Sequence, residues 1–336
     1  MPTVPQLLLV ILITGVVFVN GWTDAPNSVT GVVSTGVMGY RSAVCLAAVF
    51  NLLGLLAVSI ANASVVDTML SIADFSNTGP NLAIPALCAS MLAIILFAVG
   101  AWIFGIPTSE SHALIAGLAG GALAVGSGQI NGESWAKVLL GLSASVIFGF
   151  LMGFILSKIS SNSPIAVSDK MMDRVQILGA SAVAFMHGAQ DGQKFVAVFV
   201  VSEFLAEGVY ANSPINIGRH IPTLVFCAFV MAFGTVVGGH RIVNTVGIRM
   251  GDLEKSTSVC ADIGTALCLM IASLSGIPMS TTHTKTTAIM GACAAHDVRR
   301  VNRKIVKGMF VAWIITFPVC GLLGYGFCRL FLRLFI

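Results

Sequence analysis

The sequence predicts an all-α polytopic membrane protein that is built as an inverted-topology repeat with broken helices and two Pro/Ser-rich, hairpin-like elements. The chain of 336 residues is 56% hydrophobic and only 10% charged, and its apolar runs occupy 43–60, 84–104, 138–156, 221–238 and 310–331. A membrane-spanning helix needs about 20 such residues, whereas a spanning β-barrel would alternate at every second residue. The apolar runs therefore predict helices that cross a bilayer.

A short Pro/Ser-rich motif occurs twice and organises the rest of the chain. Residues 105–112 read GIPTSESH and residues 276–283 read GIPMSTTH; we call them cradle 1 and cradle 2. A proline beside a glycine ends one helix and begins another, which leaves unpaired amides at a helix start, where an anion is favoured. The predicted substrate contacts in the cradles are Thr108, Ser109, Ser111, Ser280, Thr281 and Thr282. Capping of the new helices is the structural alternative for these hydroxyls.

The first half opens with an apolar segment, 5–20, that runs into the polar sequence NGWTDAPN at 20–27. An acid and a proline inside apolar sequence predict a broken helix, which is tolerated at membrane depth only inside the protein or along a cavity. Segment 43–60 then crosses, 61–82 forms a loop with Asp67 and Asp74, and 84–104 returns to cradle 1. The helix expected at 113–125 is rich in the glycine and alanine that close packing of membrane helices requires.

The second half repeats this order. Apolar residues 175–186 lead to HGAQDGQK at 187–194, which sets Thr23 opposite Gln190 and Asp24 opposite Asp191. We therefore divide the chain into a first repeat at 1–160, a cytoplasmic connection at 161–175 and a second repeat at 176–336.

Basic residues orient the two repeats. Lysine and arginine gather at Arg41, 158–174, 241–255 and 299–307, which the positive-inside rule places in the cytoplasm. The loops at 61–82 and 207–220 then lie outside, as do both termini. Segments 43–60 and 221–238 consequently run in opposite directions, so the repeats are inverted.

Carboxylates inside apolar sequence are the strongest single-residue signals. An unpaired charge in the hydrocarbon region is costly, so Asp24 and Asp191 are expected to bind a cation, exchange a proton or pair with a base such as Lys194. Asp262 interrupts the apolar stretch 259–274, where cation binding and helix pairing are both open. Glu110 stands where the other repeat has Thr281, and its role is left open, as are those of His112 and His283.

Other classes of function find little support in the sequence. The eight cysteines lie in or beside apolar segments without a CxxC pair, so we expect neither disulfides nor a cysteine metal site. The net charge of +4 is scattered among loops, which argues against a nucleic-acid partner. We expect no cofactor beyond a coupling ion, and a homodimer is left open.

The residues described above resemble the inorganic phosphate transporter (PiT) family in its short bacterial form. Residues 20–27 and 187–194 resemble its two signature sequences, and 107–112 and 278–283 resemble its two P-x-S-x-[ST]-H motifs. The resemblance implies a multi-pass protein of the cell membrane that couples phosphate import to Na+ or H+. It adds Thr23 and Gln190 to the substrate contacts of the cradles. It assigns the coupling ion to Asp24, Asn27, Asp191 and Asp262, with Asp24 and Asp191 as ligands when that ion is a metal. The chain departs from the family at Thr23, Gln190 and Glu110.

Three functions are weighed from the sequence. A secondary active phosphate symporter is favoured, because neutral donors suit a tetrahedral oxyanion and carboxylates suit the cation that offsets its charge. A sulfate or other oxyanion permease is the alternative. An intramembrane serine hydrolase is remote, because Ser111 and His112 are sequence neighbours and so point to different sides of a helix. The chain is therefore not expected to be an enzyme.

Overall fold

The computed structural model describes residues 3–72, 78–126, 132–162, 168–208, 215–251 and 253–335, which are almost entirely helical. Asp74 and parts of the connections predicted at 161–175 and 207–220 lie outside the described residues. The helices of the first half are α1 (Val4–Thr23), η1 (Ala25–Val29), α2 (Thr30–Ser34), α3 (Tyr40–Ala61), α4 (Ser64–Ile72), α5 (Pro80–Ile103), α6 (Glu110–Val125) and α7 (Gly132–Asn162). Those of the second half are α8 (Asp169–His187), η2 (Gly188–Gly192), α9 (Gln193–Glu207), η3 (Ile217–His220), α10 (Ile221–Val237), α11 (His240–Val243), η4 (Asn244–Arg249), α12 (Lys255–Leu274), α13 (Thr281–Ala294), η5 (Val298–Arg300) and α14 (Arg303–Phe335).

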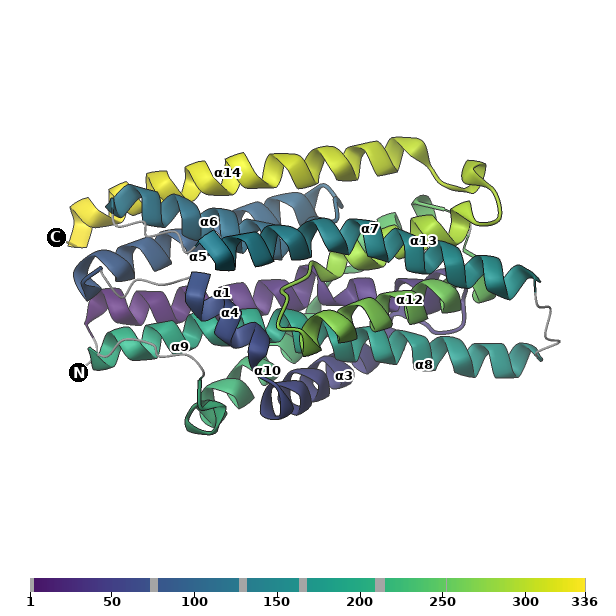
Figure 1. Ribbon diagram of the computed structural model, residues 1–336, viewed down its shortest axis with the longest axis horizontal. Coiled ribbons are helices and arrows are strands. Elements are labelled where there is room, and N and C mark those ends of the chain that lie inside the picture. Colours follow the sequence, from purple (N-terminus) through teal and green to yellow (C-terminus); the bar gives the residue numbers. More distant parts are fainter. Residues whose placement is uncertain are drawn as a thin grey trace.

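The helices form an elongated bundle in which the long elements lie along one axis (Figure 1). Within the described residues, seven helical segments are long and apolar enough to span a membrane, which confirms the prediction of an all-α polytopic membrane protein. Both termini lie at the same end of the bundle, on the left in Figure 1. At the opposite end α7 ends and α8 and α14 begin.

Each predicted helix break is a local change of helix type. Pro26 has no amide hydrogen, so α1 gives way to the 3-10 helix η1 after Thr23, with Asp24 as the C-cap residue. The second repeat has no proline at this place, and α8 passes into the π-helix η2, which holds Asp191. A π-turn widens the helix by one residue and frees backbone groups, and such turns are frequent at functional sites.

A glycine allows a neighbouring helix to approach η2 closely. A Cβ atom on Gly188 would lie 2.0 Å from the backbone oxygen of Asn51 on α3, so any larger residue would push the two helices apart.

The two cradles join the helices of two hairpins, α5–α6 and α12–α13. Gly105 and Gly276 have φ angles of +66° and +65°, which only glycine adopts without strain. The first hairpin packs along α14 and the second along α7. Each hairpin is thus supported by the long helix of the other half of the chain.

The region 61–82, predicted to be a loop, contains the additional helix α4. Its buried side chains Val65, Val66, Met69 and Leu70 face the core, and the helix packs on α9. The segment is too short and too mixed in polarity to stand out from the sequence as a helix. Asp67 in α4 accepts a hydrogen bond from the backbone nitrogen of Ile215 at 2.8 Å.

The inverted orientation of the two halves stays a prediction. So does the side of the membrane on which each end of the bundle lies, and site-directed labelling tests the latter. We expect a membrane-impermeant thiol reagent added outside to label Asn81→Cys at the start of α5 but not Arg299→Cys in η5, because the basic residues stay in the cytoplasm. Both residues are exposed, and the variants are made in a Cys45→Ser background because Cys45 is the exposed cysteine among the described residues. Labelling of position 299 from outside, without labelling of position 81, would reverse the orientation.

Candidate functional site

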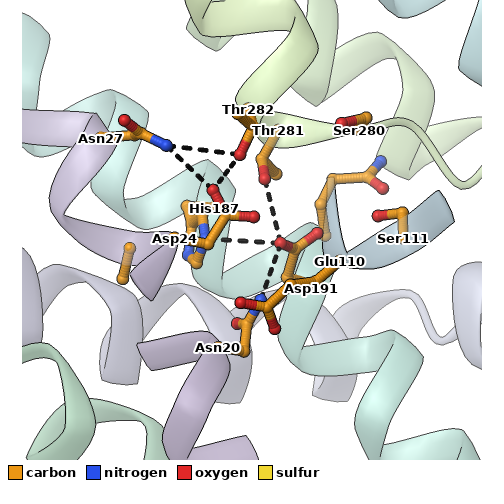
Figure 2. Close-up of polar contacts among 12 residues, drawn as sticks. Asn20, Asp24, Asn27, Glu110, Ser111, His187, Asp191, Ser280, Thr281 and Thr282 are labelled. Carbon is orange, nitrogen blue, oxygen red and sulfur yellow. Dashed lines mark hydrogen bonds and ion pairs between the residues drawn. The ribbon is translucent and has the colours of Figure 1, made fainter. Parts of the chain in front are cut away.

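Four helix ends that are far apart in the sequence meet inside the bundle. The end of α1 brings Asp24, η2 brings Asp191, and the first turns of α6 and α13 bring the two cradles (Figure 2). Both aspartates are buried. The two cradles and the two aspartates therefore lie together inside the bundle.

Asp24 is bonded to the second cradle. Thr282 Oγ1 donates to Asp24 Oδ1, and Asn27 Nδ2 donates to the same oxygen at 3.1 Å and to Thr282 Oγ1 at 3.3 Å (Figure 2). One carboxylate oxygen of Asp24 lies within 4.8 Å of ligand atoms of Asp191 and His187.

Asp191 is bonded on several sides. Lys194 Nζ lies 2.7 Å from its Oδ1, while Thr281 Oγ1 and Asn20 Nδ2 lie 3.0 Å and 3.3 Å from its Oδ2. Lys194 also donates to Ser111 Oγ at 2.7 Å and to the backbone oxygen of Met279. Since an ammonium has three donors, Lys194 is fully satisfied, and it ties Asp191 to both cradles.

The cradles begin their helices in the same way. Ser109 Oγ accepts from the His112 amide at 3.3 Å, and Ser280 Oγ accepts from the His283 amide at 3.2 Å. Both serines are thus N-caps, and within the described residues neither hydroxyl donates a hydrogen bond. Thr108 is partly exposed, whereas the other cradle hydroxyls are buried.

Two residues that were predicted to contact the substrate, Gln190 and Thr23, already form hydrogen bonds within the protein. Gln190 Oε1 accepts from the Met279 amide at 3.2 Å, and its Nε2 donates to Ser273 Oγ at 3.0 Å and to the Ile277 oxygen at 3.3 Å. This glutamine holds the loop of cradle 2 in place. Thr23 Oγ1 donates to Glu110 Oε1, which joins the first broken helix to cradle 1.

The two cradle histidines lie against each other behind the hydroxyls. Their ring centroids are 4.4 Å apart, and the ring centroid of His283 lies 3.8 Å from that of Trp313 on α14, with the rings tilted by 34°. Trp313 Nε1 donates to the Pro107 oxygen at 3.2 Å, so one tryptophan touches both cradles. The histidines therefore pack the cradles together, and Ser111 donates no hydrogen bond to either ring within the described residues.

The centre of the site is rich in carboxylates. Asp24, Asp191 and Glu110 are buried, and the ammonium of Lys194 lies on Asp191. Asp24, Asp191 and His187 each offer one ligand atom, and these atoms lie within 4.8 Å of one another. His187 Nδ1 lies 2.8 Å from Asn51 Oδ1, and His187 Nε2 lies 3.4 Å from Asp191 Oδ2. Such a surplus of acceptors favours a cation between the helix breaks.

Asp262 lies outside this cluster. Lys285 Nζ, one turn into α13, donates to Asp262 Oδ1, and both residues are buried. Its prediction as a residue of the coupling ion stays untested, as do the predictions for the other site residues.

Three residues that contact the predicted acids directly were not predicted as site residues from the sequence: Lys285, His187 and Asn20. His187 and Asn20 were visible as members of the two signature stretches. Lys285 offered the signal of a lysine two residues after the histidine of cradle 2, inside an otherwise uncharged helix.

Comparison with known proteins agrees with this geometry. The profile of the phosphate transporter family matches residues 20–168 and again residues 160–324. A probable low-affinity inorganic phosphate transporter of Rhizobium meliloti is 35% identical, with 91% of this chain and 90% of the relative covered. One of Bacillus subtilis is 31% identical, with 95% of this chain and 94% of the relative covered.

A solved structure shares the fold. It is described as the sodium-dependent phosphate transporter and matches with a TM-score of 0.86 at 20% identity, over 99% of this chain and all of the other. The two matches of the family profile cover almost the whole chain, one in each half, and confirm the resemblance of the signature sequences and cradles. They also confirm that the protein is a multi-pass transporter and not an enzyme. The chain belongs to the phosphate transporter family.

Proposed function

We propose that this protein is a secondary active symporter of the cell membrane that imports inorganic phosphate together with Na+. The observation that carries the proposal is the meeting of two hydroxyl-lined helix starts with two buried aspartates at helix breaks. The relatives are described as phosphate transporters, and the structural neighbour as sodium-dependent, which favours Na+ over H+.

The anion and the cation have separate places in this proposal. Phosphate oxygens accept from the hydroxyls and first-turn amides of α6 and α13, where the helix dipoles also favour negative charge. Na+ lies between Asp24 and Asp191, because carboxylates are hard oxygen ligands. Each ion lowers the cost of burying the other, so neither is expected to occupy the site well alone. This mutual dependence is the physical basis of symport.

Uptake into proteoliposomes tests the proposal directly. Labelled phosphate is expected to accumulate above its outside concentration when Na+ is higher outside, and to stop accumulating when the Na+ gradient is collapsed. Accumulation that follows a pH gradient in the absence of Na+ would reassign the coupling ion to H+. Failure to accumulate any oxyanion under either gradient would defeat the symporter.

Sulfate is the competing substrate, and the acceptors of the site argue against it. Phosphate keeps at least one proton near neutral pH and can donate, whereas sulfate only accepts. Glu110 Oε2 is buried and has no partner among the described residues, so it offers an acceptor to that proton.

We therefore expect Glu110→Ser to narrow the preference for phosphate over sulfate by about tenfold, since a lost buried acceptor costs roughly 1–3 kcal/mol. The measurement is inhibition of labelled phosphate uptake by excess sulfate. Gln190→Asn is the companion variant, because this glutamine holds cradle 2 and its loss is expected to slow uptake without changing the preference. Stronger inhibition by sulfate than by unlabelled phosphate in the wild type would leave an oxyanion symporter with sulfate as its substrate.

A further part of the proposal concerns the arrangement of the two halves of the chain and of two copies of the protein. The two halves act as inverted repeats around the shared site, in the manner of secondary transporters with broken helices at mid-membrane. A homodimer in the bilayer belongs to the same proposal, and the mass of the detergent-solubilised protein measures it.

A further inference from the structure

A second buried ion pair lies one helical turn beyond the central site. Lys285 follows Thr281 and Thr282 on α13, and within the described residues its ammonium donates only to Asp262 Oδ1. Lys194 uses all three of its donors, whereas Lys285 leaves donors unused in a position that is 1% exposed. The other oxygen of the acid, Asp262 Oδ2, has no partner in the described part of the chain. The pair is therefore incomplete as a purely structural contact.

The first repeat shows that the fold does not require this ion pair. The cradles align with an offset of 171 residues, which sets Lys285 opposite Leu114 and Asp262 opposite Met91. Both counterparts are buried in the main apolar cluster. One hairpin thus has an apolar pair where the other has a lysine and an aspartate, although a buried ion pair is often no more stabilising than apolar residues of similar volume.

Polar residues continue from this pair to the surface. Asp262 Oδ2 would lie 3.5 Å from a Cβ atom on Gly31 of α2 and equally from one on Gly179 of α8, so these glycines border the acid. One turn farther on α12 and α8 lie Ser258 and Gln176, both buried, with Ser258 Oγ and Gln176 Nε2 unpartnered among the described residues.

This series of polar residues ends at an ion pair that is partly exposed to solvent. Lys255 Nζ lies 2.5 Å from Asp173 Oδ1, and the two side chains are 34% and 38% exposed. This ion pair lies at the end of the bundle where α8 begins, opposite the termini (Figure 1). We use "polar column" for the residues Asp262, Lys285, Ser258, Gln176, Lys255 and Asp173.

Toward the termini, the side chains along α1 and along much of α9 are apolar. The α1 residues Leu9, Ile13 and Val16 and the α9 residues Val198 and Val201 belong to the main buried cluster, on the side of the termini. Among the described residues, the unpartnered polar atoms known on that side are Ser59 Oγ on α3 and Gln193 Oε1 on α9. The polar column differs in that it continues along α8 and α12 to the partly exposed pair Lys255–Asp173.

We propose that Lys285 and Asp262 form a second anion station, where phosphate that leaves cradle 2 replaces Asp262 as the partner of Lys285 on its way along the polar column. This inference rests on the proposed phosphate transport. Ser258 and Gln176 supply further donors, and the free Asp262 Oδ2 accepts the hydrogen of a protonated phosphate oxygen. The station thus combines donors with one acceptor, which is the set that phosphate needs and sulfate does not.

The first repeat supplies the matched variant for the test. Lys285→Leu combined with Asp262→Met copies the pair Leu114–Met91, so no unpaired charge is left buried. We expect equilibrium phosphate binding to stay within about twofold of the wild type, while the maximal uptake rate in proteoliposomes falls about tenfold. Uptake at the wild-type rate would overturn the station. An equal loss of binding and transport would also overturn it, because the pair would then only support the structure of the central site.

A second variant leaves Lys285 and Asp262 unchanged, so the test does not depend on whether the first variant folds. Ser258→Ala combined with Gln176→Leu is expected to lower the maximal rate in the same way, with unchanged binding. Ser202→Ala is its control, because Ser202 is a buried serine on α9 whose hydroxyl donates to the Phe199 oxygen away from the column. Equal rates in the control and in the Ser258/Gln176 variant would exclude the column as the route. A wild-type protein that neither binds nor transports phosphate would instead defeat the proposed function together with this station.

Discussion

Asp24→Asn and Asp191→Asn are each expected to abolish uphill phosphate uptake. An amide keeps the size of the carboxylate but removes the charge that offsets the cation in a buried site. Asp191→Asn also leaves Lys194 as an uncompensated buried charge, because the lysine lies 2.7 Å from this carboxylate. Breaking a buried pair costs roughly 3–5 kcal/mol, so this variant is expected to be the less stable of the two.

The measurement is Na+-driven phosphate uptake, together with the Na+ dependence of phosphate binding. Both variants are expected to lose the Na+ dependence, and uptake is expected to fall by more than about a hundredfold. Asp169→Asn is the control, since Asp169 is an exposed acid at the start of α8. Wild-type uptake with an unchanged ion dependence in both aspartate variants would make the two acids structural.

Local chemistry explains how much of the fold the sequence predicted. The apolar runs predicted the long helices because length and composition alone decide whether a helix can cross a bilayer. Pro26 and the Gly-Ile-Pro sequences at 105–107 and 276–278 predicted the first break and both hairpins, since proline restricts its own backbone and glycine permits a left-handed turn. The π-turn at η2 left no such trace, because its residues are compatible with an ordinary α-helix.

Contacts between distant segments explain what the sequence did not reveal about the site. The internal repeat predicted that Asp24 and Asp191 are equivalent, but it could not pair Asp24 with Thr282 or Asp191 with Thr281. It also could not show that Gln190 holds the loop of cradle 2, or that Lys285 pairs with Asp262. These partners are set by how the hairpins are packed against α7 and α14, which is a property of the whole bundle.

Lys194 is the residue whose replacement is expected to disturb both cradles at once. Its ammonium joins Ser111 of cradle 1 to the Met279 oxygen of cradle 2 and to Asp191 of η2. Lys194→Gln cannot make all three contacts with one amide group, and it leaves Asp191 without its countercharge. We therefore expect phosphate uptake to fall by about a hundredfold or more, through loss of both binding and rate.

A double variant separates the charge of Lys194 from its role as a link between the cradles. Asp191→Asn combined with Lys194→Gln removes both charges, so it is expected to recover the thermal stability that either single variant loses. Uptake is expected to stay low in the double variant, because the cation has lost a ligand and the cradles have lost their common partner. Lys137→Gln on α7 is the control, since the Lys137 side chain is 53% exposed and pairs with the exposed Glu133. If Lys194→Gln transports phosphate as well as Lys137→Gln does, the lysine does not hold the cradles together.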